Sequence, residues 1–367
     1  MKFFRILAGL LMILALVGII GVLGLLLISN GNPVDFVQTQ IVRLRISGRE
    51  ADLVSTVNQD QTPRRFTVSS GDTPRQIGIN LLNDGLINDA DLFVDYVRIA
   101  DYDTELEAGT YFLRSSQTIP EIAKILTDSR GSSIPFRVIE GWRIEQVAES
   151  IDSNPLFGFS GAEFLTVVNA GARPDPLFAQ QVGLPAGASH EGFLFPNGYS
   201  LPPDITPEGL RQALTDEYIA QVTNNGITTA ALTRGVSLYQ LTILASIVQR
   251  EAVQMEESPL IAGVYQNRLD IGMKLDADPT VQYPLGQPGD WWARITQADY
   301  SGVQSRYNTY LYTGLPPGPI ASPGLAALSG AATPESSPYF YFQADCSVNG
   351  YHKFAETYAE HLANSCF

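Results

Sequence analysis

Cysteine, histidine and basic residues are scarce in this chain of 367 residues. Two Cys and three His are too few for the usual zinc or iron–sulfur sites, so we expect no metal centre built on them. The 23 Lys and Arg are outnumbered by 38 Asp and Glu, which gives a formal charge of −15. Because nucleic acids bind basic faces, nucleic acid is not an expected partner. The hydrophobic share of 45% is enough for real cores, and the length predicts two or three domains.

One long uncharged run lies at the N-terminus. Residues 6–28 are apolar and follow Lys2 and Arg5. At about 1.5 Å per residue such a helix spans the roughly 30 Å hydrocarbon core of a membrane. Ser29-Asn30 makes a poor cleavage site, which favours an uncleaved anchor over residues 6–29. The positive-inside tendency places residues 1–5 in the cytoplasm, so the sequence predicts a single-pass protein of the cell (inner) membrane with an external catalytic part.

The two cysteines, Cys346 and Cys366, lie in this external part. A disulfide persists in such a compartment and would tie the C-terminal tail to the segment ending at Phe342. Two unpaired thiols are the alternative, and the sequence leaves the choice open.

The periodicity of the external chain predicts two α+β domains. Residues 30–61 are weakly periodic and indicate a stalk or linker. Residues 62–132 form a small module in which strands at 65–68 and 109–113 enclose helices beginning at Pro74 and after Asp89, with another short helix at Ile119.

Residues 133–367 form the larger domain. Its predicted elements are strands at 136–139 and 339–342 and helices at 143–151, 236–253, 258–271 and 323–331. The Pro- and Gly-rich segment 174–207 is typical of surface loops around a cleft, and Asp278-Pro279 is typical of a turn.

Glu251 is the residue most suited to acid–base chemistry. It follows Val248 by three positions and Leu244 by seven, so it projects from the apolar side of its helix, whereas Arg250 points about 100° away and is expected in solvent. A carboxyl group on a half-buried apolar face should have a raised pKa and act as a general acid. The alternative is an edge carboxylate paired with Arg250 or Arg268.

Other polar residues allow two interpretations. Asp276 and Asp278 could supply a second acid or bind a hard cation, but a turn that caps its own backbone is favoured. Asn267-Arg268 and the segment 307–310 could bind sugar hydroxyls or fix loops. The isolated His190-Glu191 and His352 are expected to be structural.

Several segments, taken in order, resemble the endolytic murein transglycosylases. The segments are Glu191-Gly-Phe-Leu-Phe-Pro196, Ala245-Ser-Ile-Val-Gln-Arg-Glu-Ala252, Asn267-Arg-Leu269, Asp278-Pro-Thr-Val281, Tyr307-Asn-Thr-Tyr310, Gly314-Leu-Pro-Pro-Gly-Pro-Ile-Ala321 and Pro323-Gly324. The resemblance covers roughly residues 66–361. It also includes the single N-terminal anchor and a LysM-like module over about 66–127, a type associated with glycans that contain N-acetylglucosamine.

This resemblance implies which residues act. Glu251 takes the position of the family's catalytic glutamate, and the second Glu that the family often has two positions earlier is Gln249 here. The motifs assign substrate binding to a set of polar residues, which are Asn267, Asp278, Thr280, Asn308 and Thr309. Asn197-Gly198, which replaces the family's Asp-Thr, the pair Trp291-Trp292 and the two cysteines depart from the family pattern and put substrate preference in doubt.

The expected reaction is a lytic cut of the β-1,4 bond between N-acetylmuramic acid and N-acetylglucosamine in nascent peptidoglycan strands, which leaves 1,6-anhydro ends. Glu251 acts first as acid and then as base, so no metal or organic cofactor is expected. Peptidoglycan strands are the expected substrate, and the resemblance implies cell-wall synthases as partners. Two alternatives stay open: a hydrolytic muramidase that uses Glu251 with Asp276 or Asp278, and a non-catalytic, membrane-anchored glycan-binding scaffold.

Overall fold

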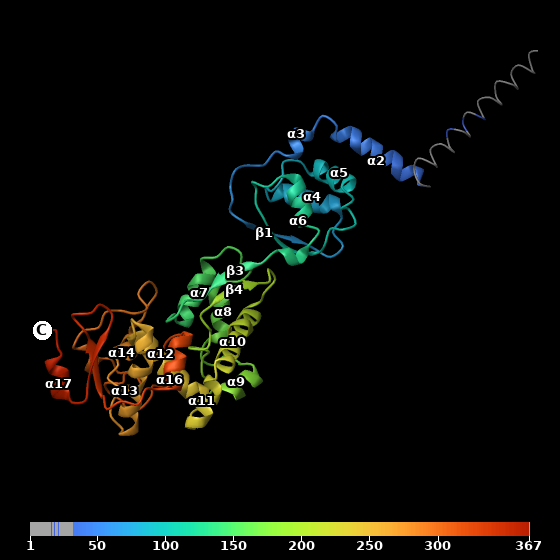
Figure 1. Cartoon of the computed structure of the whole chain (residues 1–367). Coiled ribbons are helices and arrows are strands. Elements are labelled where there is room, and N and C mark those ends of the chain that lie inside the picture. Colours follow the sequence, from blue (N-terminus) through green and yellow to red (C-terminus); the bar gives the residue numbers. More distant parts are fainter. Residues whose placement is uncertain (1–15, 17, 19–20, 22–31, 367) are drawn as a thin grey trace, which may run out of the picture. The chain divides into compact units, whose positions relative to one another are not determined.

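A computed structural model describes residues 16, 18, 21 and 32–366 of the chain (Figure 1). The predicted anchor, residues 6–29, lies outside the described residues except at 16, 18 and 21. Within the described part, no single helix has the length and apolar composition to cross a membrane; α11 (Ile227–Arg234) and α12 (Leu238–Glu251) meet both criteria only as a pair bent by 109°. The chain divides into two units, Met1–Ser133 and Ile134–Phe367, close to the boundary at 132/133 that the sequence predicts.

The first unit combines one small sheet with short helices. Strand β1 pairs antiparallel with β2, and Phe66 lies opposite Tyr111 in the register. Thr73 and Asp89 cap the two helices between these strands, each accepting a backbone N–H with its side-chain oxygen. The elements are α2 (Pro33–Ile46), α3 (Glu50–Leu53), β1 (Arg64–Val68), α4 (Pro74–Asn83), α5 (Ala90–Ile99), β2 (Gly109–Leu113), α6 (Ile119–Ile125) and the 3-10 turn η1 (Ser129–Gly131).

Residues 30–61, for which the sequence predicts a stalk, contain the helices α2 and α3 instead. Figure 1 shows α2 running beside α5, and the two helices are in contact. Val42 and Ile46 of α2, four residues apart, are buried in the core of the first unit. Apolar residues lie on more than one side of this helix, so the sequence shows no single amphipathic stripe that would have predicted it.

The second unit is mainly helical, with two separate strand pairs, so the chain as a whole mixes helix and strand as an α+β fold does. The elements up to the bend between α11 and α12 are β3 (Ile134–Arg137), α7 (Ile144–Asp152), α8 (Gly161–Val168), α9 (Pro176–Val182), β4 (Gly198–Leu201), α10 (Pro207–Asn224) and α11. The elements that follow it are α12, η2 (Met255–Glu257), α13 (Ser258–Asp270), α14 (Asp278–Leu285), α15 (Asp299–Gly302), α16 (Leu325–Ala332), β5 (Tyr341–Ala344), β6 (His352–Ala355) and α17 (Tyr358–Ala363).

Helix α12 is the centre of this unit. Residues 238–248 of α12 are buried except for Gln240, and α12 packs against both α13 and α16 (Figure 1). Close approach between α13 and the α16 region requires glycine: a Cβ on Gly330 of α16 would lie 2.7 Å from the Ser258 backbone carbon, and one on Gly263 of α13 would meet the Glu335 carbonyl. The core therefore holds the C-terminal end of α12 in a fixed place.

The expectation of surface loops over 174–207 is wrong for much of that segment. It contains α9 and β4, and residues 190–195 are buried. Phe193 lies edge-on to Phe178 and Tyr218 at centroid distances of 5.5 and 5.0 Å. Gly192 has a φ of +85°, and a Cβ there would lie 2.5 Å from Pro319. Residues 190–195 are therefore a buried irregular segment, which Pro and Gly permit because they break regular structure without requiring exposure.

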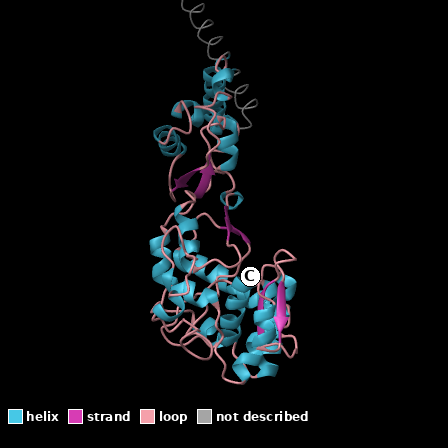
Figure 2. Ribbon diagram, turned by 90° about the vertical axis from the view of Figure 1, so that its left-hand side faces the viewer, coloured by secondary structure: helices cyan, strands magenta, loops and turns pink. Residues whose placement is uncertain are grey.

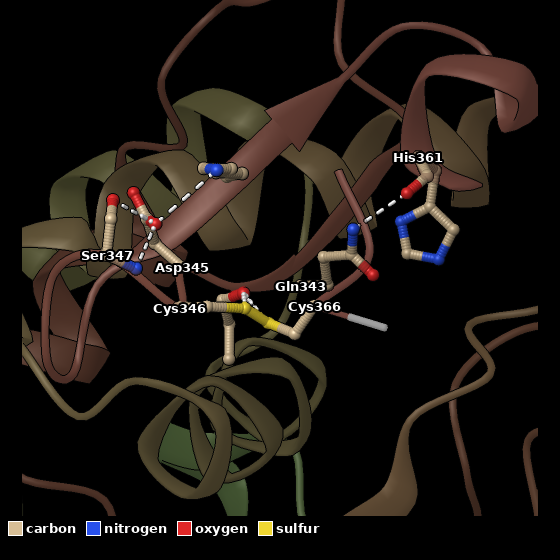
Figure 3. Close-up of a disulfide and its surroundings, with 8 residues drawn as sticks. Gln343, Asp345, Cys346, Ser347, His361 and Cys366 are labelled. Atoms are coloured by element: carbon tan, nitrogen blue, oxygen red, sulfur yellow. Dashed lines mark hydrogen bonds and ion pairs between the residues drawn. A yellow bond between two sulfur atoms is a disulfide. The ribbon is translucent and has the colours of Figure 1, made fainter. Parts of the chain in front are cut away.

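The C-terminal residues form the antiparallel pair β5–β6 with α17 beside it (Figure 2). Cys346 and Cys366 are joined in a disulfide with their Cα atoms 5.8 Å apart (Figure 3), which settles the pairing that the sequence left open. Figure 3 also shows the Gln343 side chain donating to the His361 carbonyl at 2.7 Å. The bridge and this hydrogen bond fasten the last residues to β5.

Candidate active site at the end of helix α12

Glu251 is the last residue of α12. Ser237 and Gln240 form a capping box at the start of this helix, and Ala252 leaves the helical conformation at its end. Val248 and Ala252 on either side are buried, while Glu251 itself is partly exposed. The carboxyl group thus stands at the edge of the core, on the apolar side of the helix, as the periodicity predicts.

The neighbours of Glu251 favour its protonated form. Burial raises its pKa to about 7, and the negative charge of Asp278 adds to this effect. The Tyr265 hydroxyl of α13 donates a 2.9 Å hydrogen bond to Oε1 of Glu251, which opposes the rise, as do the charges of Arg268 and Arg250. The predicted rise in pKa is confirmed, and the hydrogen-bond partner is Tyr265 rather than either arginine.

Asp278 begins helix α14, so the prediction of a turn there is wrong. Pro279 takes the first turn of that helix, where a proline needs no N–H partner. The Tyr310 hydroxyl donates to Oδ1 of Asp278 at 2.7 Å and the Tyr300 hydroxyl to Oδ2 at 3.4 Å. These two rings lie 4.3 Å apart. Asp278 is held by two tyrosines and lies near enough to Glu251 to raise its pKa.

Three of the predicted substrate-binding residues are fully enclosed. The hydroxyls of Thr280 and Thr309 lie 2.8 Å apart, and Thr309 also accepts the Ala277 N–H at 3.0 Å. Asn308 donates to the carbonyls of Tyr300 and Val303. Exposed fractions are 1% or less for all three. They link the start of α14 to the 300–310 loop and so position Asp278 and its tyrosines; a direct contact with sugar stays a prediction.

Asn267 and Arg268 connect α13 to the segment that enters β5. The Asn267 amide donates to the carbonyls of Ser337 and Tyr339 at 2.9 and 2.8 Å. The Arg268 guanidinium donates to the carbonyls of Phe340 and Leu275 at 2.6 and 2.5 Å. Both side chains therefore fix loops around the site, and substrate binding by Asn267 also stays a prediction.

Arg250 is not in solvent, contrary to expectation. Its guanidinium lies 4.0 Å from the centroid of the Trp292 ring, and burial lowers its pKa. Arg143 stacks on the neighbouring Trp291 at 5.0 Å. Arg250 points about 100° away from Glu251, as predicted. The Trp291-Trp292 segment covers that side of the helix, and no pattern within α12 could reveal this contact.

Glu191 is a second buried carboxyl group, at a position that the sequence predicts to be structural. Its Oε2 accepts hydrogen bonds from the Tyr283 hydroxyl at 3.3 Å and from the Ile144 N–H at 3.4 Å. Its Oε1 has no partner among the described residues. Burial raises its pKa to about 8. The apolar residues 193–195 that follow it were the available signal of its burial.

Residues 16, 18, 21 and 32–366 contain no group of three or more Cys, His, Asp or Glu side chains arranged to hold a metal.

A cavity of about 780 Å³ lies between α11, α13 and the residues after α16, and its lining includes Arg234 and Asn267. Glu251 does not line this cavity, so it is separate from the candidate active site.

Comparison with known proteins gives a consistent result. The curated relatives include an endolytic murein transglycosylase of Bacillus subtilis, 29% identical over 325 residues that cover 84% of this chain and 86% of that protein. A protein of the same name from Streptococcus pneumoniae is 28% identical over 302 residues, which are 76% of this chain and 53% of the longer relative. A crystal structure of a putative YceG-like protein from Listeria monocytogenes matches with a TM-score of 0.55 and 26% identity, over 83% of this chain and all of that one. The sequence profile of the YceG-like family matches residues 66–366, and the chain belongs to that family.

Proposed function

We propose that this chain is an endolytic lytic transglycosylase of peptidoglycan and that Glu251 is its catalytic residue. The observation that carries the proposal is a partly exposed carboxyl group whose pKa is raised to about 7 by burial, at the motif position that the resemblance assigns to the catalytic glutamate. The names of the curated relatives support the same reaction.

In the proposed mechanism Glu251 serves twice. Its protonated carboxyl donates to the glycosidic oxygen between N-acetylmuramic acid and N-acetylglucosamine while positive charge develops at the anomeric carbon. The carboxylate that remains takes the proton of the muramic acid C6 hydroxyl, whose oxygen closes the 1,6-anhydro ring. The nucleophile is a hydroxyl of the substrate itself and lies close to the anomeric carbon, so no activated water is needed. A pKa near 7 suits both steps, because acid and base forms are then both accessible near neutral pH.

In the alternative reaction, a hydrolytic muramidase, Asp278 would be the residue that activates water. Its carboxyl group lies close enough to influence Glu251, and it could activate a water if it were free. Tyr310 and Tyr300, however, both donate to its oxygens. Both carboxylate oxygens are therefore engaged, which favours a role in raising the pKa of Glu251 over the activation of water.

The chain's remaining predicted features belong to the same proposal. An anchor over residues 6–29 would hold the external catalytic unit at the cell membrane, where new strands emerge, and near the cell-wall synthases that the resemblance implies as partners. The LysM-like assignment of residues 62–132 would add glycan binding. A chain without residues 1–29 should cut soluble strands as well as the full chain yet fail to set strand length in cells; full rescue by the shortened chain would count against the anchoring role.

The test is mass spectrometry of the products formed from uncrosslinked glycan strands. The proposal expects 1,6-anhydro-muramic ends from the wild-type chain and none from Glu251→Gln. Reducing ends, heavier by one water, would assign a hydrolase and turn attention to Asp276 and Asp278. Retained glycan binding without products from either protein would favour the scaffold.

A further inference from the structure

Helix α2 has two opposite apolar faces, of which its own unit uses only one. Val42 and Ile46 are buried in the core of the first unit, where α2 packs against α5. An ion pair of 3.1 Å between Arg45 and Asp95 of α5 fixes the helix at its C-terminal end. The orientation of α2 about its own axis is therefore set by contacts within the first unit.

The other face is an apolar stripe in solvent. It consists of Val34, Val37, Ile41 and Leu44, with exposed fractions between 42% and 76%. We call these four residues the α2 stripe. Their spacing of three, four and three residues is the heptad spacing of a coiled-coil seam, with 34 and 41 at position a and 37 and 44 at position d. Val42 and Ile46 then occupy positions b and f, on the far side of the helix.

The composition of the α2 stripe favours a two-helix contact. Both a positions carry a β-branched residue, and one d position carries leucine, which is the pattern of parallel dimers. The flanking e and g positions include Gln38, Gln40 and Arg45, so no like charges oppose each other between g of one helix and e of the next. A helix lying on a membrane would need a broad apolar face, whereas the α2 stripe is narrow and the opposite side of the helix already faces α5.

The chain that precedes α2 supplies a reason for two copies to meet. The apolar run ends at Ile28, and only residues 29–32 separate it from Pro33. Two heptads are too short to hold a dimer by themselves in water. Anchors in one membrane, however, would keep two α2 helices parallel and at a high effective concentration, which converts a weak contact into a populated one.

We propose that the α2 stripe is a parallel homodimer contact between two copies of this chain in one membrane. The proposal goes beyond the transglycosylase function and does not depend on it. It rests on the exposure of the four residues, on their heptad spacing and on the short link to the apolar run.

Cysteine cross-linking of the full-length chain in proteoliposomes tests this contact. Leu44→Cys places a thiol in the seam, and Arg43→Cys places one on the adjacent residue, which is also exposed but lies outside it. The native Cys346–Cys366 bridge leaves no other free thiol in the described chain. Under mild oxidation we expect a covalent dimer from Leu44→Cys at about ten times the yield from Arg43→Cys, because membrane tethering raises the local concentration of both equally while only the seam aligns the thiols. Equal yields, or no dimer from Leu44→Cys, would overturn the proposal.

A charge substitution provides the second measurement. Ile41→Glu puts two carboxylates opposite each other in the seam, whereas Gln38→Glu adds the same charge on the flank, and both sites are exposed in the single copy. Energy transfer between labelled full-length chains in vesicles should fall to the level of unrelated membrane proteins for Ile41→Glu and stay near the wild-type level for Gln38→Glu. Unchanged transfer in Ile41→Glu would refute the dimer. Absence of transfer in every chain, with a fluorophore at Leu44→Cys that reports an apolar surrounding on lipid, would assign the α2 stripe to the membrane surface instead.

Discussion

Glu251 and Glu191 are two buried carboxyl groups in the same unit, and they differ in what surrounds them. Burial is the main cause of the raised pKa of both, to about 7 for Glu251 and about 8 for Glu191. Glu251 ends a helix and is partly exposed, whereas Glu191 lies in an irregular segment and is only 1% exposed. A raised pKa therefore does not by itself identify a catalytic acid; access for a substrate separates the two.

The largest expected effect is on turnover, which should depend on Glu251. Glu251→Gln removes the proton donor while keeping the shape of the side chain, so turnover on glycan strands should fall by about 10²–10⁴-fold. Thermal unfolding at about pH 4, where the carboxyl is largely protonated in both the folded and the unfolded chain, should change little. The matched control is Glu208→Gln, at an exposed glutamate of α10, which should keep wild-type activity. Turnover in Glu251→Gln within a few fold of the wild type would show that another residue is the acid.

The second expected effect separates them by stability against pH. The carboxyl of Glu191 has a pKa of about 8 in the folded chain against 4.5 when exposed, so the folded state binds more protons between these values. Stability is then full below pH 4.5 and falls as the pH rises through 8, by up to about 5 kcal/mol for this one group. Glu191→Gln should flatten the decline in melting temperature between pH 5 and pH 9.

Glu251→Gln provides the comparison for that measurement. The pKa of the Glu251 carboxyl in the folded chain is about 7. Glu251→Gln should therefore remove a smaller part of the decline in melting temperature, and its effect should level off about one pH unit lower than that of Glu191→Gln. Parallel melting curves for the wild type and Glu191→Gln over the whole range would contradict the burial of a protonated carboxyl at residue 191.

A smaller effect should follow from Tyr265, which contacts Glu251 alone of the two glutamates. Its hydroxyl stabilises the ionised carboxylate and so lowers the pKa of Glu251. Tyr265→Phe should therefore move the alkaline limb of kcat/KM to higher pH, by roughly half a unit to one unit, the equivalent of one hydrogen bond. Tyr283→Phe, which removes the corresponding hydroxyl from Glu191, should leave the limb where it is. A limb that moves equally in both variants would refute the assignment.

The smallest effect has the opposite sign. The charge of Asp278 raises the pKa of Glu251, so Asp278→Asn should move the same alkaline limb to lower pH, by a few tenths of a unit. The pH dependence of kcat/KM checks this as well, with Asp276→Asn as the neighbouring control. A shift to higher pH would mean that Asp278 does not act on Glu251 through its charge.

Local signals made much of the fold predictable. Thr73, Asp89 and Ser237 have side chains that cap helices, and the sequence predicts helices that begin at or next to these positions. Alternation likewise predicts β1 and β2 within a residue of their observed bounds. These signals lie within a few residues of the elements that they specify, so one sequence is enough to read them.

The site was predictable only in part. The position of Glu251 and its raised pKa follow from the period of one helix, which is local information. Other parts of the site depend on contacts between segments more than twenty residues apart. These are the contact of Arg250 with the Trp292 ring and the hydrogen bonds that two tyrosines donate to Asp278. The same holds for Glu191, whose partners come from α7 and α14. No pattern within one segment specifies such contacts, because tertiary packing decides them.

The pH dependence of kcat/KM for the wild-type chain on uncrosslinked strands tests the central claim most directly. This quantity reports the ionisation of the free enzyme, which is the state described here. If Glu251 is the buried general acid, activity falls as the pH rises through about 7, the pKa to which burial raises this carboxyl. A decline that instead sets in near pH 4.5, the ordinary value for an exposed glutamate, would contradict the assignment.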